Sequence, residues 1–462
     1  MNRKSVLDKI KEKKFKKLCE NIVADMKRLD VPGVAVGIWY NGEEFSAGLG
    51  ITSVENPLPI TPETLFQIGS ISKTFTGTLL MQQIEKGRLN LDTPIRTYLP
   101  KLKLSDALVA EKVTTRHLLN HTGGWIGDYF NDFGTGNDAL AKMVKSISDL
   151  PQITPLGEVW SYNNTGFNIA GRLVEVLNHK PYEKAAHKQL IDPLGLRQTF
   201  FYPDDRILTN RFVAGHSRQD GKTRVALPWA VGRATNPVGG VVSTVVDLLK
   251  YARFHMGTGR NSEEQQILAR ESLEAMRFPQ AEAGGRGKIC ITWFMRQAGE
   301  LTVFGHGGAT HGQQASLQII PEKDFALAIL TNSDSGGTIT DHTFRWALEL
   351  YFNAALPAPI AKPKTDAELL EYAGMYDLPL SAFNLEVKDG YLLCQEIPRG
   401  GFPTPQTPPG PADPPVRLGF YDQDRVVILD EPGQGSLGEF LRDTDGRLKL
   451  FRLGGRVHPK IK

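Results

Sequence analysis

The proline-rich segment ALPAPIAKPKT, residues 355–365, divides this 462-residue chain into a long and a short part. Its prolines cannot continue a helix, because proline lacks a backbone N–H and fixes φ. Such a segment suits a semi-rigid linker. The chain is also longer than most single hydrophobic cores can organise. We therefore predict a first domain over 1–355, a linker over 356–365 and a second domain over 366–462.

Strand and helix patterns are mixed in the first domain, which predicts an α+β fold. The segment VPGVAVGIWYNGEEFSAGLG reads as two strands joined at Asn41-Gly42, a dipeptide that tolerates the positive φ angles of a hairpin turn. Strand patterns return late in the domain, and residues of about 89–234 predict a mostly helical subdomain between them. Apolar residues at helical spacing from Val6 to Leu29 predict one long helix packed on the sheet. We expect an antiparallel sheet flanked by helices.

Beyond the linker the pattern changes to short strands, with turn signals at Asp389-Gly390 and Asp445-Gly446. A polar, proline-dense segment, GGFPTPQTPPGPADPP, interrupts these strands. The pattern predicts a small all-β domain, either a barrel or a sandwich.

Composition limits the classes of partner. The chain has 54 basic and 51 acidic side chains, so its net charge of +3 gives no indication of nucleic-acid binding. The basic N-terminal segment has no continuous apolar stretch of the signal-peptide kind, and we expect a cytoplasmic protein that binds no membrane. Widely spaced Cys19, Cys290 and Cys394 argue against a disulfide framework or zinc site. His117 and His121 lack the carboxylate of an HExxH helix, so structural hydrogen bonds are expected there.

Ser70 and Lys73 lie three residues apart in GSISKTFT, just before an apolar run that predicts a helix ending near Gly87. Residues with this spacing share a helix face. A serine hydroxyl is a poor nucleophile until a base takes its proton, and lysine can be that base when burial or positive charge lowers its pKa. The same pattern also fits a helix cap followed by a surface charge. Its meaning therefore depends on other motifs.

Two such motifs follow: Tyr162 and Asn164 with YxN spacing in WSYNNTGFNIAG, and His306-Gly307-Gly308 after a strand. In this order, the three motifs resemble those of the serine β-lactamase and penicillin-binding-protein superfamily. The stretches LLNHTGG, DPLGL and NPVGGVVSTVVDLLKYARF resemble its class C β-lactamase-like branch, which includes family VIII esterases and D-aminopeptidases. The segment beginning YAGMYDLP resembles the lipocalin-like β-barrel appended to some members.

The resemblance implies a β-lactamase-like fold and acyl-enzyme chemistry that needs no cofactor. It implies Ser70 as the nucleophile, with Lys73 and Tyr162 sharing proton transfer; which of the two is the base for acylation stays open. Asn164 would hydrogen-bond the lysine or the substrate amide. The remaining substrate-binding positions are His306, Gly307, Gly308 and Ala309, with the backbone N–H groups of Ser70 and Ala309 as the oxyanion hole.

Histidine at position 306 departs from the lysine that penicillin-recognising members usually have, whereas esterase and aminopeptidase members often have histidine. We therefore expect hydrolysis of small esters, amides or short peptides, including those with D-residues. Two alternatives stay open: a β-lactamase or penicillin-binding D-Ala-D-Ala carboxypeptidase, and a non-catalytic binding module on the same fold. The C-terminal domain has two candidate roles, covering the cleft or assembling a homo-oligomer.

Overall fold

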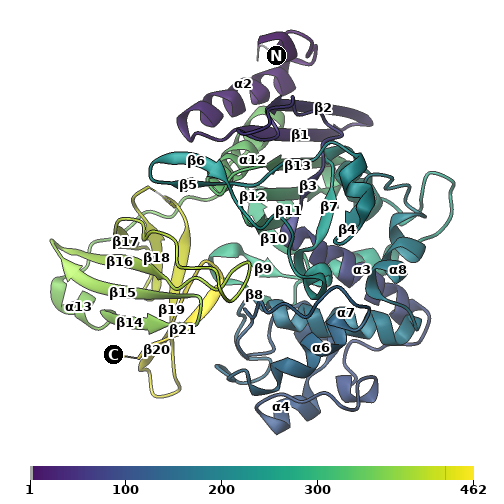
Figure 1. The fold of residues 1–462 in the computed structure, drawn as a ribbon. Helices are drawn as coiled ribbons and strands as arrows, with labels where there is room; N and C mark the ends of the chain where they lie inside the picture. Colours follow the sequence, from purple (N-terminus) through teal and green to yellow (C-terminus); the bar gives the residue numbers. More distant parts are fainter. Residues whose placement is uncertain (1–3, 432, 462) are drawn as a thin grey trace.

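The computed structural model describes residues 4–431 and 433–461 and shows two antiparallel eight-stranded sheets, each in its own part of the chain (Figure 1). The first sheet is flanked by helices, which confirms the predicted α+β fold. Its β1–β2 turn is at Asn41 and Gly42, whose φ angles are 49° and 84°, as the hairpin prediction requires. In spatial order its strands are β2 (Glu43–Gly50), β1 (Gly33–Tyr40), β13 (Phe325–Thr331), β12 (Gln313–Ile320), β11 (Leu301–Thr310), β10 (Phe294–Ala298), β9 (Lys288–Ile289) and β8 (Ala281–Glu282).

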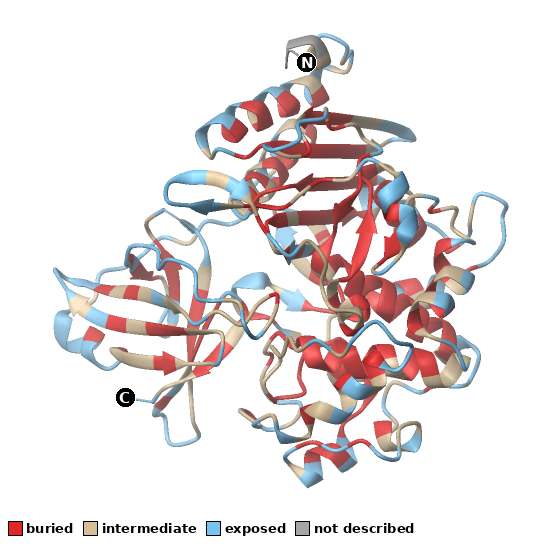
Figure 2. Cartoon of the chain, in the orientation of Figure 1, coloured by how far each residue is buried: buried red, intermediate tan, exposed pale blue. Residues whose placement is uncertain are grey.

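Helices cover both faces of this sheet, so its central strands are buried (Figure 2). The helices α2 (Lys13–Arg28) and α12 (Gly336–Phe352) pack on one face, and α10 (Val245–Met256) packs on the other. The single N-terminal helix that we predicted is wrong, because α1 (Lys4–Leu7) is separate from α2. The Glu12 carboxylate accepts the Phe15 N–H and thereby starts a new helix.

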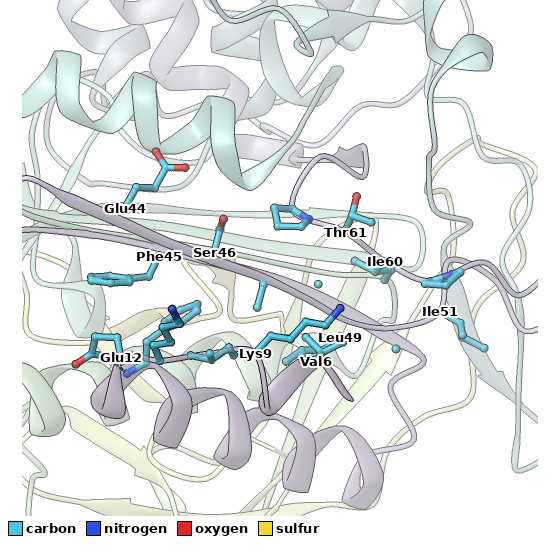
Figure 3. Close-up of a pocket in the computed structure, with 18 of the residues that line it drawn as sticks. Val6, Lys9, Glu12, Glu44, Phe45, Ser46, Leu49, Ile51, Ile60 and Thr61 are labelled. Atoms are coloured by element: carbon cyan, nitrogen blue, oxygen red, sulfur yellow. Dashed lines mark hydrogen bonds between the residues drawn. The ribbon is translucent and has the colours of Figure 1, made fainter. Parts of the chain in front are cut away.

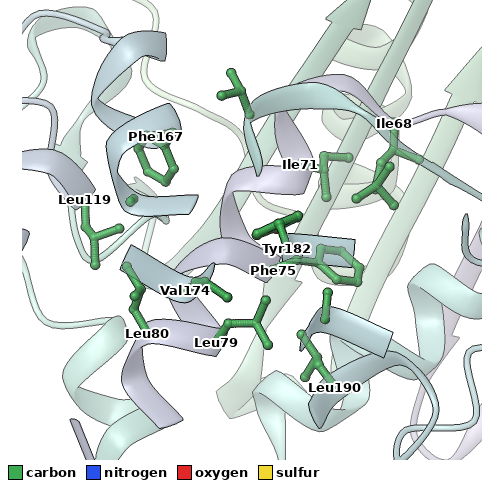
Figure 4. Close-up of a cluster of buried hydrophobic side chains, with 14 of the residues drawn as sticks. Ile68, Ile71, Phe75, Leu79, Leu80, Leu119, Phe167, Val174, Tyr182 and Leu190 are labelled. Carbon is green, nitrogen blue, oxygen red and sulfur yellow. The ribbon is translucent and has the colours of Figure 1, made fainter. Parts of the chain in front are cut away.

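The helix α3 (Ser72–Glu85) runs through the core beside α10 and the helical region. Every residue from Ser72 to Gln83 is buried. Figure 4 shows Phe75, Leu79 and Leu80 of α3 among side chains of the neighbouring helices. A lysine in the first turn of such a helix is necessarily removed from water.

Residues of about 89–234 carry helices but also short strands. The helices are α4 (Ala107–Lys112), α5 (Thr115–Leu119), α6 (Ala139–Ser146), α7 (Asn164–Asn178) and α8 (Tyr182–Ala186), followed after this region by α9 (Asn236–Gly239) and α11 (Arg270–Met276). Within this region, β5 (His216–Gln219) pairs with β6 (Lys222–Val225), and β4 (Phe200–Phe201) forms a small sheet with two strands from outside it, β3 (Phe66–Gln67) and β7 (Val241–Ser243).

The second sheet follows α13 (Asp366–Leu370) and curls into a nearly closed barrel, which confirms the predicted all-β barrel-like fold. Its first and last strands meet where the Ile461 N–H donates to the Met375 carbonyl at 2.9 Å. The strands follow one another in chain order: β14 (Gly374–Asp377), β15 (Ser381–Lys388), β16 (Tyr391–Pro398), β17 (Val416–Phe420), β18 (Arg425–Ile428), β19 (Leu437–Arg442), β20 (Leu448–Leu453) and β21 (Arg456–Pro459).

A cavity of about 890 Å³ lies between the N-terminal helices and the edge strand β2 (Figure 3). Val6, Phe45 and Leu49 contribute to its apolar lining. None of the three candidate catalytic motifs lines it, so the candidate chemistry lies elsewhere. Among the described residues, no helix is long and apolar enough to cross a membrane.

Candidate active site

The structure brings Ser70 and Lys73 together. Ser70 lies in a single 3-10 turn, Gly69–Ile71, that leads into α3. The Lys73 Nζ donates to Ser70 Oγ at 3.0 Å and to the Val238 carbonyl at 2.9 Å. The lysine is fully buried, and no salt bridge joins it to a carboxylate within residues 4–431 and 433–461. Burial, followed by the nearby Arg456, lowers the Lys73 pKa well below its usual value.

Ser72, the other serine of this motif, has a structural position. Its Oγ donates to the Gly69 carbonyl at 2.7 Å and accepts the Val241 N–H at 3.1 Å. These bonds hold the 3-10 turn against β7, and they leave Ser70 as the serine that faces the lysine.

Tyr162 and Asn164 approach the same point from the start of α7. The side chain of Asn163 caps this helix by accepting the Gly166 N–H at 2.7 Å, so Asn164 is its first residue. The Lys73 Nζ lies 4.9 Å from the centroid of the Tyr162 ring. Burial raises the Tyr162 pKa to about 12, and the neighbouring Ser70 hydroxyl partly opposes this. The phenol is therefore protonated at neutral pH.

Strand β11 brings Ala309 beside the Ser70 turn. A Cβ atom on Gly308 would lie 1.9 Å from the Ile68 carbonyl oxygen, and one on Gly69, whose φ is 51°, would lie 2.6 Å from the Ala309 nitrogen. Only glycine permits such close backbone approach. As a result, the backbone N–H groups of Ser70 and Ala309 belong to two segments in direct contact.

One edge of β11 is open beyond the point where its neighbour stops. Strand β10 pairs with β11 only as far as Gly305. Gly307 and Ala309 are exposed, while Gly308 is buried against the Ser70 turn. An extended ligand could hydrogen-bond to this edge in the manner of an added strand.

His306 is a neutral imidazole in this structure. Its side chain is buried, and burial lowers its pKa to about 3. Its Nδ1 lies 2.6 Å from the Gly307 carbonyl oxygen. Because a carbonyl only accepts, Nδ1 carries the proton and Nε2 is the acceptor. The position therefore supplies no fixed positive charge.

His121, for which structural hydrogen bonds were expected, has such a bond and also supports Tyr162. Its Nδ1 accepts the Asn163 N–H at 3.0 Å. Its ring stacks on the Tyr162 ring with centroids 4.3 Å apart. The contact with tyrosine was not predicted, because nothing local in RHLLNH indicates a partner 41 positions later in the sequence.

Asp128 and Arg456 also belong to the site, and the sequence analysis missed both. The Asp128 carboxylate accepts hydrogen bonds from Asn164 Nδ2 at 2.6 Å and from Arg456 Nε at 2.8 Å. Burial opposes ionisation, but the guanidinium and the amide hold the Asp128 pKa below its usual value. Asp128 and Arg456 are 328 residues apart and come from a loop and a Gly-Gly-Arg turn, neither of which carries a periodic signal.

Comparisons with known proteins identify the family of this chain and support its fold. A family model described as Beta-lactamase matches residues 18–351. Penicillin-binding protein 4 of Amycolatopsis lactamdurans is 32% identical over 357 residues, which cover 75% of this chain and 93% of that protein. The crystal structure of SurE superposes with a TM-score of 0.76 at 23% identity, covering 97% of this chain and 99% of that chain. The octameric penicillin-binding protein homologue from Pyrococcus abyssi superposes with a TM-score of 0.64 at 23% identity, covering 96% of this chain and 98% of that chain. This chain belongs to the Beta-lactamase family.

Proposed function

We propose that this chain is a serine hydrolase that forms an acyl-enzyme on Ser70 and cleaves small esters, amides or short peptides. The observation that carries the proposal is the buried amine of Lys73, without a carboxylate partner among the described residues, at 3.0 Å from Ser70 Oγ. Burial lowers the Lys73 pKa, which increases the fraction of neutral amine, and a neutral amine can accept the serine proton. The Ser70 Oγ then attacks the substrate carbonyl.

The second half of the acylation step needs a proton for the leaving group. Tyr162 is protonated at neutral pH and close to Ser70, so it suits this role, whereas the lowered Lys73 pKa suits the role of base. The N–H groups of Ser70 and Ala309 would bind the oxyanion that develops on the carbonyl. The proton on Lys73 then passes to the Tyr162 phenolate. Water attacks the acyl carbonyl, giving its hydroxyl to the acyl group and its proton to Ser70 Oγ.

The neutral His306 favours esters and amides over substrates that need a fixed cation at this position. Substrate would lie along the open edge of β11, with His306 and Gly307 beside it and Asn164 on the other side. The rival proposal is a β-lactamase or D-Ala-D-Ala carboxypeptidase, which the similarity to penicillin-binding protein 4 supports. Faster hydrolysis of a chromogenic cephalosporin than of any ester or aminoacyl amide would favour the rival.

Intact-mass detection of acyl-enzymes tests mechanism and substrate class together. The panel contains esters, D- and L-aminoacyl amides and β-lactams. Wild-type protein should gain the acyl mass and turn over, Ser70→Ala should do neither, and the exposed Ser262→Ala should behave as wild type. Equal hydrolysis by Ser70→Ala and wild type would exclude the proposal, and a folded protein that a serine-directed phosphonate leaves unmodified would indicate a binding module.

The domain boundaries and assembly remain proposals as well. The barrel has a hydrophobic core of its own, with members from Leu369 to Leu453, which supports a linker at 356–365. A homo-oligomer is supported by the printed description of the Pyrococcus abyssi homologue as octameric. Sedimentation of the full chain tests this: a single monomeric species would argue against it. The cytoplasmic location also stays a prediction.

A further inference from the structure

The turn between β20 and β21 of the C-terminal barrel is docked on the segment that carries Tyr162. The Tyr162 N–H donates to the Gly455 carbonyl at 2.9 Å, and the Val457 N–H donates to Ser161 Oγ at 3.3 Å. The Arg452 guanidinium donates to the Trp160 carbonyl. Three consecutive residues of the first domain are therefore hydrogen-bonded to one hairpin of the second.

This docking places a guanidinium beside the active site. Arg456 follows the turn directly, and its Nε and Nη2 donate to the Asp128 carboxylate at 2.8 and 3.2 Å. The side chains of Asp128 and Arg456 are 14% and 32% exposed, so the pair is largely shielded from water. A shielded, two-pronged contact of this kind fixes direction as well as charge.

Asp128 in turn determines which way the amide of Asn164 points. An ionised carboxylate only accepts hydrogen bonds, so the group 2.6 Å from Asp128 Oδ1 must be the NH₂ of Asn164. The Asn164 carbonyl oxygen is then the free acceptor; it is buried and has no partner among the described residues. This is the orientation in which the amide can receive a hydrogen bond from the Lys73 amine or from a substrate N–H.

We infer that Asp128 and Arg456 are positioning residues of the Ser70 site: Arg456, supplied by the barrel, holds Asp128, and Asp128 orients the amide of Asn164. This inference rests on the proposed function. It assigns the C-terminal barrel a part in building the site, beyond covering a cleft. No hydrogen bond joins either residue to Ser70 or Lys73 in the described part of the chain. Both act through Asn164 and through the charge that Lys73 experiences, and the Arg456 guanidinium also lies 4.8 Å from the centroid of the Tyr162 ring.

Asp128 and Arg456 carry opposite charges near Lys73, so their effects on the Lys73 pKa can be told apart. The groups facing the lysine are Tyr162, His121, His306, Asp128 and Arg456. Burial keeps both histidines and the phenol uncharged at neutral pH. Beyond burial, Arg456 lowers the Lys73 pKa and Asp128 raises it. Loss of the cation and loss of the anion therefore move the lysine titration in opposite directions.

The test follows the rate at which a fluorophosphonate modifies Ser70, by intact mass as a function of pH, together with kcat and KM for an ester. Arg456→Gln and Asp128→Asn should each slow modification and lower kcat by about 10- to 100-fold, because a displaced amide misplaces the reacting groups, while KM changes little. The pH at half-maximal rate should rise in Arg456→Gln and fall in Asp128→Asn. Arg456→Lys, which keeps the charge but not the fork, should recover part of the rate.

Arg417→Gln is the matched control, because it breaks a two-pronged ion pair with Asp430 in the same barrel. It should leave rates and pH profile unchanged. If Arg456→Gln does not fold, Arg456→Lys and Asp128→Asn still decide the question. Wild-type rates in the variants, or pH midpoints that move in the same direction, overturn the inference while the function stands. Wild-type protein that is not modified at Ser70 overturns the proposed function itself.

Discussion

Replacing Gly308 with alanine should separate the two backbone segments that meet beside the Ser70 hydroxyl. The new Cβ atom would lie 1.9 Å from the Ile68 carbonyl oxygen, whereas ordinary contact begins at 3.4 Å. The difference, 3.4 minus 1.9, requires a displacement of 1.5 Å between β11 and the turn. The three nearest atoms that this Cβ atom would meet, in Ile68 and Ser70, are all backbone atoms, so no flexible side chain can absorb the displacement.

The displacement would move the Ala309 N–H away from the Ser70 N–H. Removal of one oxyanion-hole donor typically costs about 3 kcal/mol, or roughly 10²- to 10³-fold in kcat. Overpacking should also lower the free energy of unfolding by about 1–3 kcal/mol. We therefore expect Gly308→Ala to fold less stably and to form the acyl-enzyme at least ~100-fold more slowly.

Ester turnover, acyl-enzyme formation by intact mass and urea unfolding measure these effects. Gly307→Ala is the stability control, because its Cβ atom would have only the Ala315 oxygen nearby, at 3.7 Å. Its free energy of unfolding should stay within about 0.5 kcal/mol of wild type. A Gly308→Ala protein whose kcat equals the wild-type value would refute the assignment of Ala309 to the oxyanion hole.

Two further predictions concern the buried polar groups. Lys73→Met should abolish hydrolysis yet raise the free energy of unfolding at neutral pH by roughly 1–3 kcal/mol, because the buried amine has lost its water. The unfolded chain holds the Lys73 proton more tightly than the folded protein, so the wild-type free energy of unfolding should rise with pH towards the ordinary lysine pKa of 10.5. The difference in free energy of unfolding between Lys73→Met and wild type should therefore narrow as the pH rises. A difference that does not change with pH in urea titrations would contradict this. Asn163→Ala removes the cap of α7 and a hydrogen bond to the Trp125 carbonyl, so it should lower the free energy of unfolding by about 1–3 kcal/mol, measured by thermal or urea unfolding. It should also lower kcat, because the neighbouring Tyr162 is held less firmly. Unchanged stability would show that the cap is dispensable.

The motif residues could be predicted because the residue types and spacing within each short stretch indicate its role. Ser70 and Lys73 are separated by one helical turn, and His306 precedes Gly307 and Gly308, the second of which close packing on the Ser70 turn demands. The hairpin turn at Asn41 could also be predicted, since asparagine followed by glycine favours the positive φ angles that such a turn needs. Spacing along the chain thus predicts contacts made within one element or turn.

A side-chain cap that competes with a local pattern, and contacts between distant segments, could not be predicted in this way. The break at Glu12 depends on a side chain capping the next helix, which competes with an otherwise unbroken helical pattern. Asp128 and Arg456 have ordinary surface residue types. The loop that carries Asp128 lies against the start of α7, and only the docking of the barrel brings Arg456 to Asp128. Neither the type of a residue nor the local spacing of apolar residues indicates such long-range contacts.

The hairpin at Arg456 also sets an order of events during synthesis. A ribosome adds roughly 5 to 20 residues per second, so Arg456 is made about 16 to 66 seconds after Asp128, 328 residues earlier. Throughout that interval the nascent chain already contains Ser70 and Lys73 but not the hairpin that holds the Tyr162 segment. Hydrolytic competence should therefore emerge late, after the barrel has left the ribosome and docked, which delays an activated serine until the fold around it is complete.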